Sequence, residues 1–420
     1  MLLTRTSNAA RILATALLAL PLSAAALQVT KPEDVGLSSD RLKRINEMID
    51  RRIAAGDISG AVTLVARRGR VVHFEAQGLA NLDAKKPMAK DAVFRLASMS
   101  KPVTGVAIMM LVEEGRIRLT DPVSRYIPEF RGLKVAVVQP ARGGAANAQA
   151  APQFYTVPAD REITIRDLLS HVSGLVSGPI STAEAAKVAR KPGETLADYI
   201  PRLASVPLEF QPGSRWSYSP GAGFDTLGRV VEVVSGQTFD AFLRQRIFNP
   251  LEMKDIGFNA TAAMAPRQAT IYQKRDGKLQ VSANAAANGQ PNVYFSGAGG
   301  LMSSTEDYLP LGQMLVNGGQ LNGKRLLSPR TVDMMASPHA PDSLPGRTPG
   351  QSFGLSVRLV SDHVKAVSAL SDGSFGWSGA QGTHFWVDPK EKIVAILMVQ
   401  TSIGEMQRDF EEAVMQSIIE

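Results

Sequence analysis

The chain has 420 residues, of which 44% are hydrophobic and 20% are charged, and its formal net charge is +7. This composition is typical of a globular protein with a large core, and the absence of a basic run argues against nucleic-acid binding. The sequence contains no cysteine, which excludes disulfide bonds and a lipid-modified cysteine anchor.

The first predicted element is a processing signal at the N-terminus. Arg5 and Arg11 precede an apolar run at residues 12–22, and small residues follow at 23–26. The run is shorter than the roughly 20 residues that a membrane-spanning helix needs. We therefore expect residues 1–26 to be a signal peptide and the mature protein to be exported, most simply to a bacterial periplasm, without stable membrane insertion. An uncleaved anchor is the alternative.

Sheet and helix signals then appear at both ends of the mature chain. Residues 41–55 repeat apolar side chains at helical spacing, and a closing helix is expected at 406–419. Alternating or apolar runs on either side of short turns predict two β-hairpins. Their strands are expected at residues 61–66, 71–75, 383–387 and 393–399.

The middle of the chain carries mainly helical signals. Helices are predicted at residues 103–114, 165–169 and 227–234. Residues 138–160 are rich in alanine, glycine and proline and are interpreted as an exposed, flexible insertion. This order predicts an α+β fold: an antiparallel sheet flanked by N- and C-terminal helices, with an inserted, mainly helical lobe.

The predicted domains follow from that order. An α/β domain would combine residues 30–95 with 296–420, and a helical domain would span 96–295. The functional site is expected between the two domains.

The stretch RLASMSKPVT at residues 95–104 places Ser98 three positions before Lys101, with Pro102 directly after it. Residues three apart share a helix face, and proline is tolerated in the first turn, so the hydroxyl and the amine should lie side by side. A serine needs an adjacent base to act as a nucleophile, and lysine can be that base only if its pKa is lowered. The alternative interpretation is a capping serine beside a solvated lysine.

Two later stretches add candidate residues. Tyr218 lies in the turn-rich stretch QPGSRWSYSPG, where a phenol could relay a proton to a leaving group. The run FGWSGAQGT at 375–383 is rich in small residues, which would let backbone N–H groups approach a substrate carbonyl. Without that chemistry, the tyrosine would only fill a lobe interface and the glycines would only form a turn.

Three motifs occur in order along the chain: SMSK at 98–101, YSP at 218–220 and WSGA at 377–380. This pattern resembles the serine β-lactamase and penicillin-binding superfamily, and within it most closely the class C β-lactamases and the family VIII carboxylesterases. The resemblance covers nearly the whole mature chain. It includes the stretches EEGRIRLTDPVSRYIPEF, ITIRDLLSHVSGL, QPGSRWSYSPG, IFNPLEMKDIGF and SGAGGLMSSTEDY.

The resemblance implies a role for each matching residue. Ser98 would be the acylated nucleophile, Lys101 its base or electrostatic partner, and Tyr218 the group that shuttles a proton to the leaving alcohol. The backbone N–H groups of Ser98 and Ala380 would form the oxyanion hole. The neighbouring substrate-binding residues would be Trp377, Ser378 and Gly379.

Two departures from the β-lactamase pattern bear on the substrate. Pro220 replaces an asparagine that could bind a substrate amide, and Trp377 replaces a lysine that could bind a substrate carboxylate. Tryptophan offers an apolar face without charge, as the family VIII esterases also do at this position. Neutral esters should therefore be favoured.

The sequence thus predicts an exported serine hydrolase that cleaves small carboxylic esters through an acyl-enzyme on Ser98. A β-lactamase or D-amino-acid peptidase with the same machinery is one alternative, and a non-catalytic ligand-binding or sensor protein is the other. No metal or organic cofactor is expected, because this mechanism needs none. The histidines also lack metal-ligand spacing, so no zinc site is proposed at His73, His339, His363 or His384. His171 is interpreted as a histidine bonded within its loop. The oligomeric state is not indicated.

Overall fold

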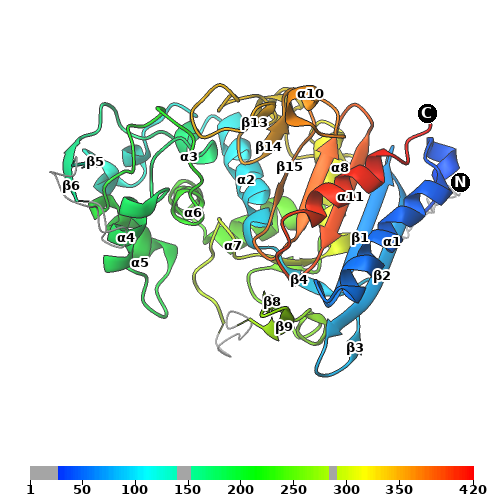
Figure 1. Cartoon of the computed structure of the whole chain (residues 1–420). Helices are drawn as coiled ribbons and strands as arrows, with labels where there is room; N and C mark the ends of the chain where they lie inside the picture. Colours follow the sequence, from blue (N-terminus) through cyan, green and yellow to red (C-terminus); the bar gives the residue numbers. More distant parts are fainter. Residues whose placement is uncertain (1–26, 140–152, 283–290) are drawn as a thin grey trace, which may run out of the picture.

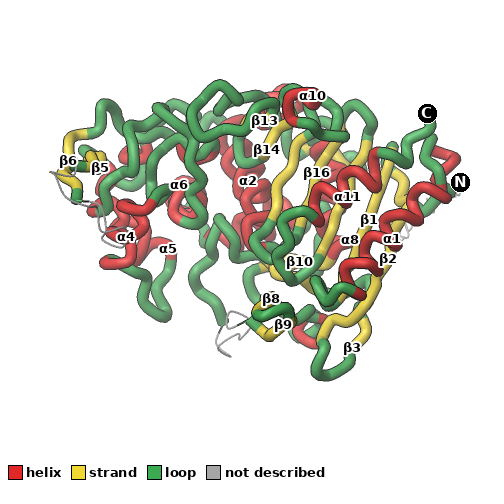
Figure 2. The backbone as a smooth tube through the Cα atoms, in the orientation of Figure 1, coloured by secondary structure: helices red, strands yellow, loops and turns green. Residues whose placement is uncertain are grey.

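The computed structural model describes residues 27–139, 153–282 and 291–420. The predicted signal peptide at 1–26 and most of the predicted insertion at 138–160 lie outside these ranges, and both stay predictions. The described chain has an α+β fold, as predicted: an antiparallel sheet with helices on both faces, beside a mainly helical region (Figure 1, Figure 2).

The main sheet joins strands from both ends of the chain. β1 (Gly60–Arg67) pairs with β2 (Arg70–Asn81) on one side and with β17 (Ile393–Met398) on the other. The remaining described strands of this sheet are β13 (Gln351–Phe353), β14 (Arg358–Val360), β15 (Phe375–Ser378), β16 (His384–Asp388) and β3 (Lys86–Pro87). Both predicted hairpins, β1–β2 and β16–β17, are confirmed.

Helices cover both faces of the sheet, which explains why every residue of β1 and β17 is buried. α1 (Ser39–Ala54) and α11 (Met406–Met415) lie side by side on one face (Figure 1). α8 (Thr305–Val316) and α2 (Lys101–Glu113) pack on the other. Two apolar faces leave no position for an alternating polar pattern along these strands.

The C-terminal helix ends earlier than the predicted residue 419. Beyond Met415 the backbone pairs with the start of the described chain: the Ser38 N–H donates to the Ser417 carbonyl, and the Ile419 N–H donates to the Gly36 carbonyl. These hydrogen bonds replace those that a longer helix would make.

The helical region lies beyond α2, on the side of the sheet away from α1 (Figure 1). Its helices are α3 (Ile165–Leu169), α4 (Pro179–Lys187), α5 (Leu196–Tyr199), α6 (Ala222–Ser235) and α7 (Phe239–Leu243). Short helices α9 (Pro329–Met335) and α10 (His363–Ala366) follow α8 in the chain. Short strands outside the main sheet are β4 (Val93–Arg95), β7 (Ile256–Gly257), β8 (Tyr272–Arg275), β9 (Lys278–Val281), β10 (Met302–Ser304), β11 (Gln320–Leu321) and β12 (Lys324–Arg325).

The described edges of the predicted insertion form strands. β5 (Lys134–Val138) pairs with β6 (Phe154–Pro158), so residues 154–158 are not the loop that we expected. Phe154, Tyr155, Thr156 and Val157 all favour strands, and this local preference outweighs the turn-forming composition around them.

One apolar core connects the sheet to the helical region. The same cluster contains Leu64 of β1, Val106 of α2 and Phe224 of α6. The predicted domain boundaries at residues 95/96 and 295/296 stay a prediction. Among the described helices, none combines the length and apolar character that crossing a bilayer requires.

Arg67, at the end of β1, is buried with 2% of its surface exposed. Its guanidinium donates to the carbonyls of Val35, Gly36 and Glu420 at 2.9, 2.7 and 2.8 Å. It also forms an ion pair with Glu391 at 2.7 Å. A single cation thus satisfies carbonyls from both ends of the described chain.

Replacing this arginine tests its contribution to stability. Arg67→Met should lower the free energy of unfolding by about 3 kcal/mol, because buried carbonyls and Glu391 lose their donor. Chemical denaturation with urea measures the change. Arg68→Met is the matched control, since Arg68 is exposed. Equal stability of the two variants would contradict the assignment.

Candidate active site

Ser98 lies in a short 3₁₀ turn, η2 (Ala97–Ser100), that leads directly into α2. Ala97 has a φ of 46°, a left-handed conformation that is uncommon for a residue with a side chain. The turn is held from outside: the Tyr308 hydroxyl donates to the Met99 carbonyl at 2.7 Å, and the Leu301 N–H donates to Ser100 Oγ at 3.2 Å. These hydrogen bonds fix the position of the turn that carries Ser98.

Ser98, Lys101 and Tyr218 lie in direct contact. Lys101 Nζ is 3.1 Å from Ser98 Oγ, and the Tyr218 hydroxyl is 2.6 Å from the same oxygen. Ser98 and Tyr218 are half-buried, whereas the Lys101 side chain is fully buried. The three predicted catalytic side chains thus meet at one oxygen atom that solvent can reach in part.

Two backbone carbonyls fix the position of the lysine amine. Lys101 Nζ donates to the carbonyls of Pro220 and Ala298, each at 2.8 Å. Burial lowers the pKa of Lys101 to about 7, although the charge of Asp225 opposes the shift. A neutral amine can donate its two protons to these carbonyls and turn its lone pair toward Ser98. Near neutral pH, Lys101 can therefore accept a proton from Ser98.

Tyr218 has the opposite tendency. Burial raises the pKa of its phenol above the usual value, and the hydrogen bond with Ser98 only partly opposes this shift. The phenol therefore keeps its proton at neutral pH and is suited to donate it. This difference divides the two roles: the lysine has the properties of a base, and the tyrosine those of an acid.

A buried carboxylate supports the segment that holds Lys101. Asp225, on α6, accepts hydrogen bonds from the Tyr294 hydroxyl at 2.8 Å, the Ser296 hydroxyl at 2.6 Å and the Ala298 N–H at 3.0 Å. Burial raises the pKa of Asp225, against these hydrogen bonds and the charge of Lys101. Asp225 thus fixes the residue whose carbonyl binds the lysine amine.

The third predicted motif lies beside the Ser98 turn. Thr383 Oγ1 donates to the Leu96 carbonyl at 2.9 Å. A Cβ on Gly379 would come within 2.2 Å of the same carbonyl oxygen, so glycine is needed there for packing. Ala380 is exposed at the tip of the following turn. Among the described residues, neither the Ser98 nor the Ala380 backbone N–H has a hydrogen-bond partner.

Trp377 and Ser378 point into different surroundings. The Trp377 ring lies 5.6 Å from the Tyr218 ring and 5.0 Å from the Phe353 ring, measured between centroids. Ser378 Oγ forms a hydrogen bond with His384 Nδ1 at 2.8 Å. The tryptophan therefore borders the proposed catalytic residues, while the serine is bound to a buried histidine.

A cation lies near this aromatic group. The Arg347 guanidinium is centred 4.4 Å from the Trp216 ring and 5.7 Å from the Phe353 ring. It donates to the carbonyls of Gln351 and Ser352, each at 3.0 Å. Burial lowers the pKa of Arg347 to about 10, so it stays charged at neutral pH. The Trp377 indole, by contrast, contacts aromatic rings, among them those of Tyr218 and Phe353.

His171 is buried among the same rings, 4.7 Å from Tyr218 and 5.3 Å from Phe224 between centroids. Its Nδ1 accepts a hydrogen bond from the Ser219 N–H at 3.2 Å. Burial, followed by the charge of Lys101, keeps the pKa of His171 well below its usual value. His171 is therefore neutral and orders the Tyr218 loop, which agrees with the interpretation of His171 as a loop-bonded residue.

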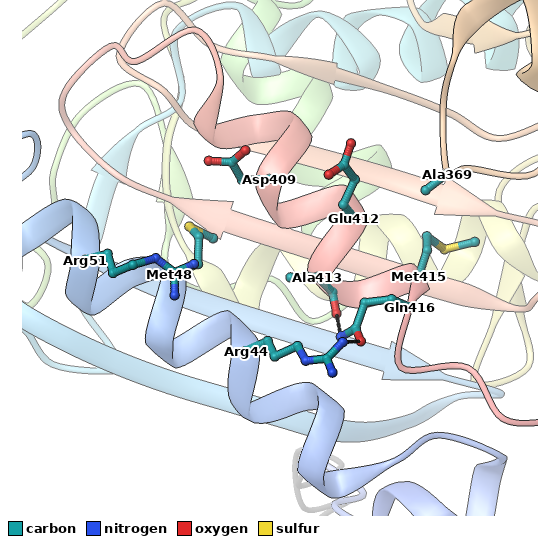
Figure 3. A pocket seen from close by; sticks show the side chains of 9 residues that line it. All are labelled: Arg44, Met48, Arg51, Ala369, Asp409, Glu412, Ala413, Met415 and Gln416. Atoms are coloured by element: carbon teal, nitrogen blue, oxygen red, sulfur yellow. Dashed lines mark hydrogen bonds between the residues drawn. The ribbon is translucent and has the colours of Figure 1, made fainter.

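The remaining surface offers other cavities. A groove of about 670 Å³ lies between α1 and α11, on the face of the sheet opposite α2 (Figure 3). Arg44 in this groove donates a hydrogen bond to the side chain of Gln416, the residue that follows α11. A cavity of about 950 Å³ is lined in part by Gly299 and Gly300, which follow the lysine-binding Ala298. Within the described residues, no three His, Asp or Glu side chains converge to hold a metal ion.

Comparison with known proteins agrees with the geometry. The profile of the family described as Beta-lactamase matches residues 45–418. Protein Rv1367c of Mycobacterium tuberculosis (strain ATCC 25618 / H37Rv) is 35% identical over 363 residues, which cover 82% of this chain and 86% of that protein. Esterase EstB of Burkholderia gladioli is 31% identical over 389 residues, 86% of this chain and 91% of EstB.

Solved structures share the fold. EstCE1, described as a hydrolase with promiscuous acyltransferase activity, has a TM-score of 0.74 and 27% identity, over 90% of this chain and 99% of its own. These similarities define the class of the protein as a serine hydrolase. More specifically, the chain belongs to the β-lactamase family, as its motifs indicated.

Several residues of the site were missed in the sequence. Asp225 is a single acid within a helical stretch, and the carbonyls of Pro220 and Ala298 carry no side-chain signal. Glu411, which hydrogen-bonds His384 at 3.0 Å, is one of several acids in its helix. Sequence spacing cannot find such groups, because tertiary contacts alone bring them to the site.

If Lys101 is the base, the rate of ester hydrolysis should depend on pH. Only the neutral amine accepts a proton, and burial lowers the pKa of Lys101 to about 7. The value of kcat/KM for a neutral ester should therefore rise with pH up to about 7 and then level off. A pH series from 5.5 to 9 measures this. A flat profile over that range would exclude Lys101 as the titrating base.

Removing the charge of Asp225 should move the same profile. Asp225 raises the pKa of Lys101, so Asp225→Asn should shift the acidic limb to lower pH. Displacement of the Ala298 carbonyl should also lower kcat/KM by about tenfold to a hundredfold. Asp276→Asn, at an exposed turn, is the control. An unshifted limb in a folded Asp225→Asn variant would contradict the electrostatic coupling.

Proposed function

We propose that this protein hydrolyses small carboxylic esters through an acyl-enzyme on Ser98. The observation that carries the proposal is the contact of Ser98 Oγ with both a buried amine, at 3.1 Å, and a phenol, at 2.6 Å. A serine hydroxyl is a weak nucleophile on its own, and an adjacent base with a pKa near neutrality makes it competent. The esterase relative EstB supports this substrate class.

Acylation begins with attack of Ser98 Oγ on the ester carbonyl. The proton of Ser98 passes to Lys101 Nζ while the Oγ–carbon bond forms. The negative carbonyl oxygen would be stabilised by the N–H groups of Ser98 and Ala380. The bond to the alcohol oxygen then breaks, and Tyr218 gives its proton to the departing alcohol, to be reprotonated from Lys101.

Deacylation repeats these steps with water. The water molecule attacks the acyl carbon, and its proton passes to the neutral Lys101 Nζ, which then gives a proton to Ser98 Oγ as that oxygen leaves. The bond between Ser98 Oγ and the acyl carbon breaks, which releases the carboxylic acid and restores the serine hydroxyl. Apart from the ester and water, the proposed acylation and deacylation steps use only groups of this chain.

The ring of Trp377 favours uncharged alcohol groups. Because Tyr218 protonates the leaving alcohol, and Trp377 lies 5.6 Å from the Tyr218 ring, the alcohol half of the ester would lie beside the indole. An indole provides an apolar face for that half. β-Lactams and D-peptides carry a carboxylate in the corresponding half, so they should be poorer substrates.

Substitution of the nucleophile tests the proposal. Ser98→Ala should reduce hydrolysis of p-nitrophenyl butyrate by roughly 10³-fold or more, because the acyl-enzyme cannot form. Mass spectrometry of the intact wild-type protein with a fluorophosphonate should detect one adduct, located on Ser98.

The alternatives give different results in the same experiment. Faster turnover of nitrocefin or a D-Ala-D-Ala peptide than of short esters would replace the esterase proposal by the corresponding amide hydrolysis. A folded wild-type protein that neither reacts with the fluorophosphonate nor hydrolyses any of these substrates would favour the non-catalytic binding protein.

A further inference from the structure

The cavity of about 950 Å³ adjoins the turn that carries Ser98. Its wall includes Gly299 and Gly300. A Cβ on Gly299 would come within 3.3 Å of the carbonyl carbon of Ala97, so this wall packs against the residue before the proposed nucleophile. None of the three proposed catalytic residues lines the cavity, and the mechanism above leaves it unused. Its volume is in the range of sites for small organic molecules.

The cavity combines positive charge with apolar surface. Arg95 and Arg190 line it, and none of the other lining residues is charged. Arg190 is exposed, and its guanidinium is centred 4.5 Å from the ring of Tyr294. Arg95 is half-buried. The apolar part of the lining includes Phe258 and Met302.

The strand register places the Arg95 side chain on the face of β4 that borders the cavity. Phe94 belongs to the main core, whereas Val93 belongs to a separate small cluster with Met302. Side chains alternate along a strand, so Arg95 shares the face of Val93. Arg95 is also paired directly with Met302 of β10, which lines the cavity. The guanidinium therefore lies on the cavity side of this small sheet.

The Arg95 guanidinium has no partner among the described residues. Every other buried or half-buried arginine of the described chain is bonded to a carboxylate or to backbone carbonyls. Arg267, for example, donates two hydrogen bonds to Asp255. Residues 1–26, 140–152 and 283–290 contain no aspartate or glutamate, so they offer no carboxylate side chain to Arg95.

We propose that this cavity binds an organic anion, with Arg95 as the anchor of a carboxylate or phosphate group and the apolar lining around the carbon chain. A partly buried cation without a partner is costly, and an anion from outside the chain removes that cost. The guanidinium presents N–H donors in a fork that matches two oxygens of either group. Arg190 adds a second positive charge, which raises the local concentration of anions.

Two sources have this chemistry. One is a free organic anion. The other is an ester whose acyl half ends in an acid group, because the cavity adjoins the Ser98 turn. Only the second source rests on the proposed function, since binding of a free anion needs no hydrolysis.

Calorimetric titration of the wild-type protein with hexanoate, in Tris chloride buffer, measures binding without turnover. 1-Hexanol has the same carbon chain without the charge, and hexyl phosphate is the second anion. Both anions should bind at least about tenfold more tightly than 1-hexanol, because a hydrogen bond to a charged group contributes that factor or more. Equal binding of hexanoate, hexyl phosphate and 1-hexanol would overturn the inference.

Substitution of the anchor locates the site. Arg95→Gln should weaken binding of both anions by about tenfold or more and leave binding of 1-hexanol unchanged. Arg131→Gln is the matched control, since Arg131 is exposed and lies outside the cavity lining. Unchanged affinity for the anions in a folded Arg95→Gln variant would contradict the proposal. If that variant does not fold, Arg190→Gln decides in the same way, with a severalfold weakening expected.

Ester hydrolysis separates the two sources. Monoethyl adipate and ethyl hexanoate have acyl chains of equal length, and only the first ends in a carboxylate. If the acyl half carries the anion, kcat/KM for monoethyl adipate relative to ethyl hexanoate should fall about tenfold in Arg95→Gln. If the anion is a free molecule, this ratio stays constant while hexanoate binding weakens. A protein that binds hexanoate through Arg95 but hydrolyses no ester would contradict only the proposed function.

Discussion

The site depends on the burial of one amine. Lys101 is enclosed at the start of α2, and its nitrogen reaches Ser98 Oγ and two backbone carbonyls. In water an amine is protonated at neutral pH and cannot serve as a base. Enclosure removes hydration from the charged form and brings the pKa of Lys101 to about 7. In the proposed mechanism, the lysine can activate the serine only because α2 is apolar around it.

That burial requires contributions from distant parts of the chain. The Pro220 carbonyl comes from the Tyr218 loop, and the Ala298 carbonyl comes from the segment held by Asp225. A third segment, after β15, packs its Gly379 against the Ser98 turn. A fully buried ammonium without partners would be costly, so the carbonyls make the protonated form tolerable as well. The amine can therefore alternate between its two states within one fixed arrangement.

The sequence was most informative where a local pattern determines the structure. The hairpins, α3 and the course of α2 could be predicted, because apolar spacing and turn residues act over a few positions. The motifs located Ser98, Lys101 and Tyr218, which the fold brings into contact. The partners that tune them could not be found. Asp225 and Glu411 resemble ordinary helical acids in sequence, and only long-range packing removes them from water.

The pairing of β1 with β17 has a consequence for synthesis of the protein. Val62 of β1 pairs with Met398 of β17. During synthesis, β1 therefore lacks this partner strand until the end of the chain has been translated. Until then the nascent chain exposes an apolar strand edge, which can recruit strands from other molecules. A chaperone that binds unfinished chains would therefore be most effective in preventing such pairing before the last strands leave the ribosome.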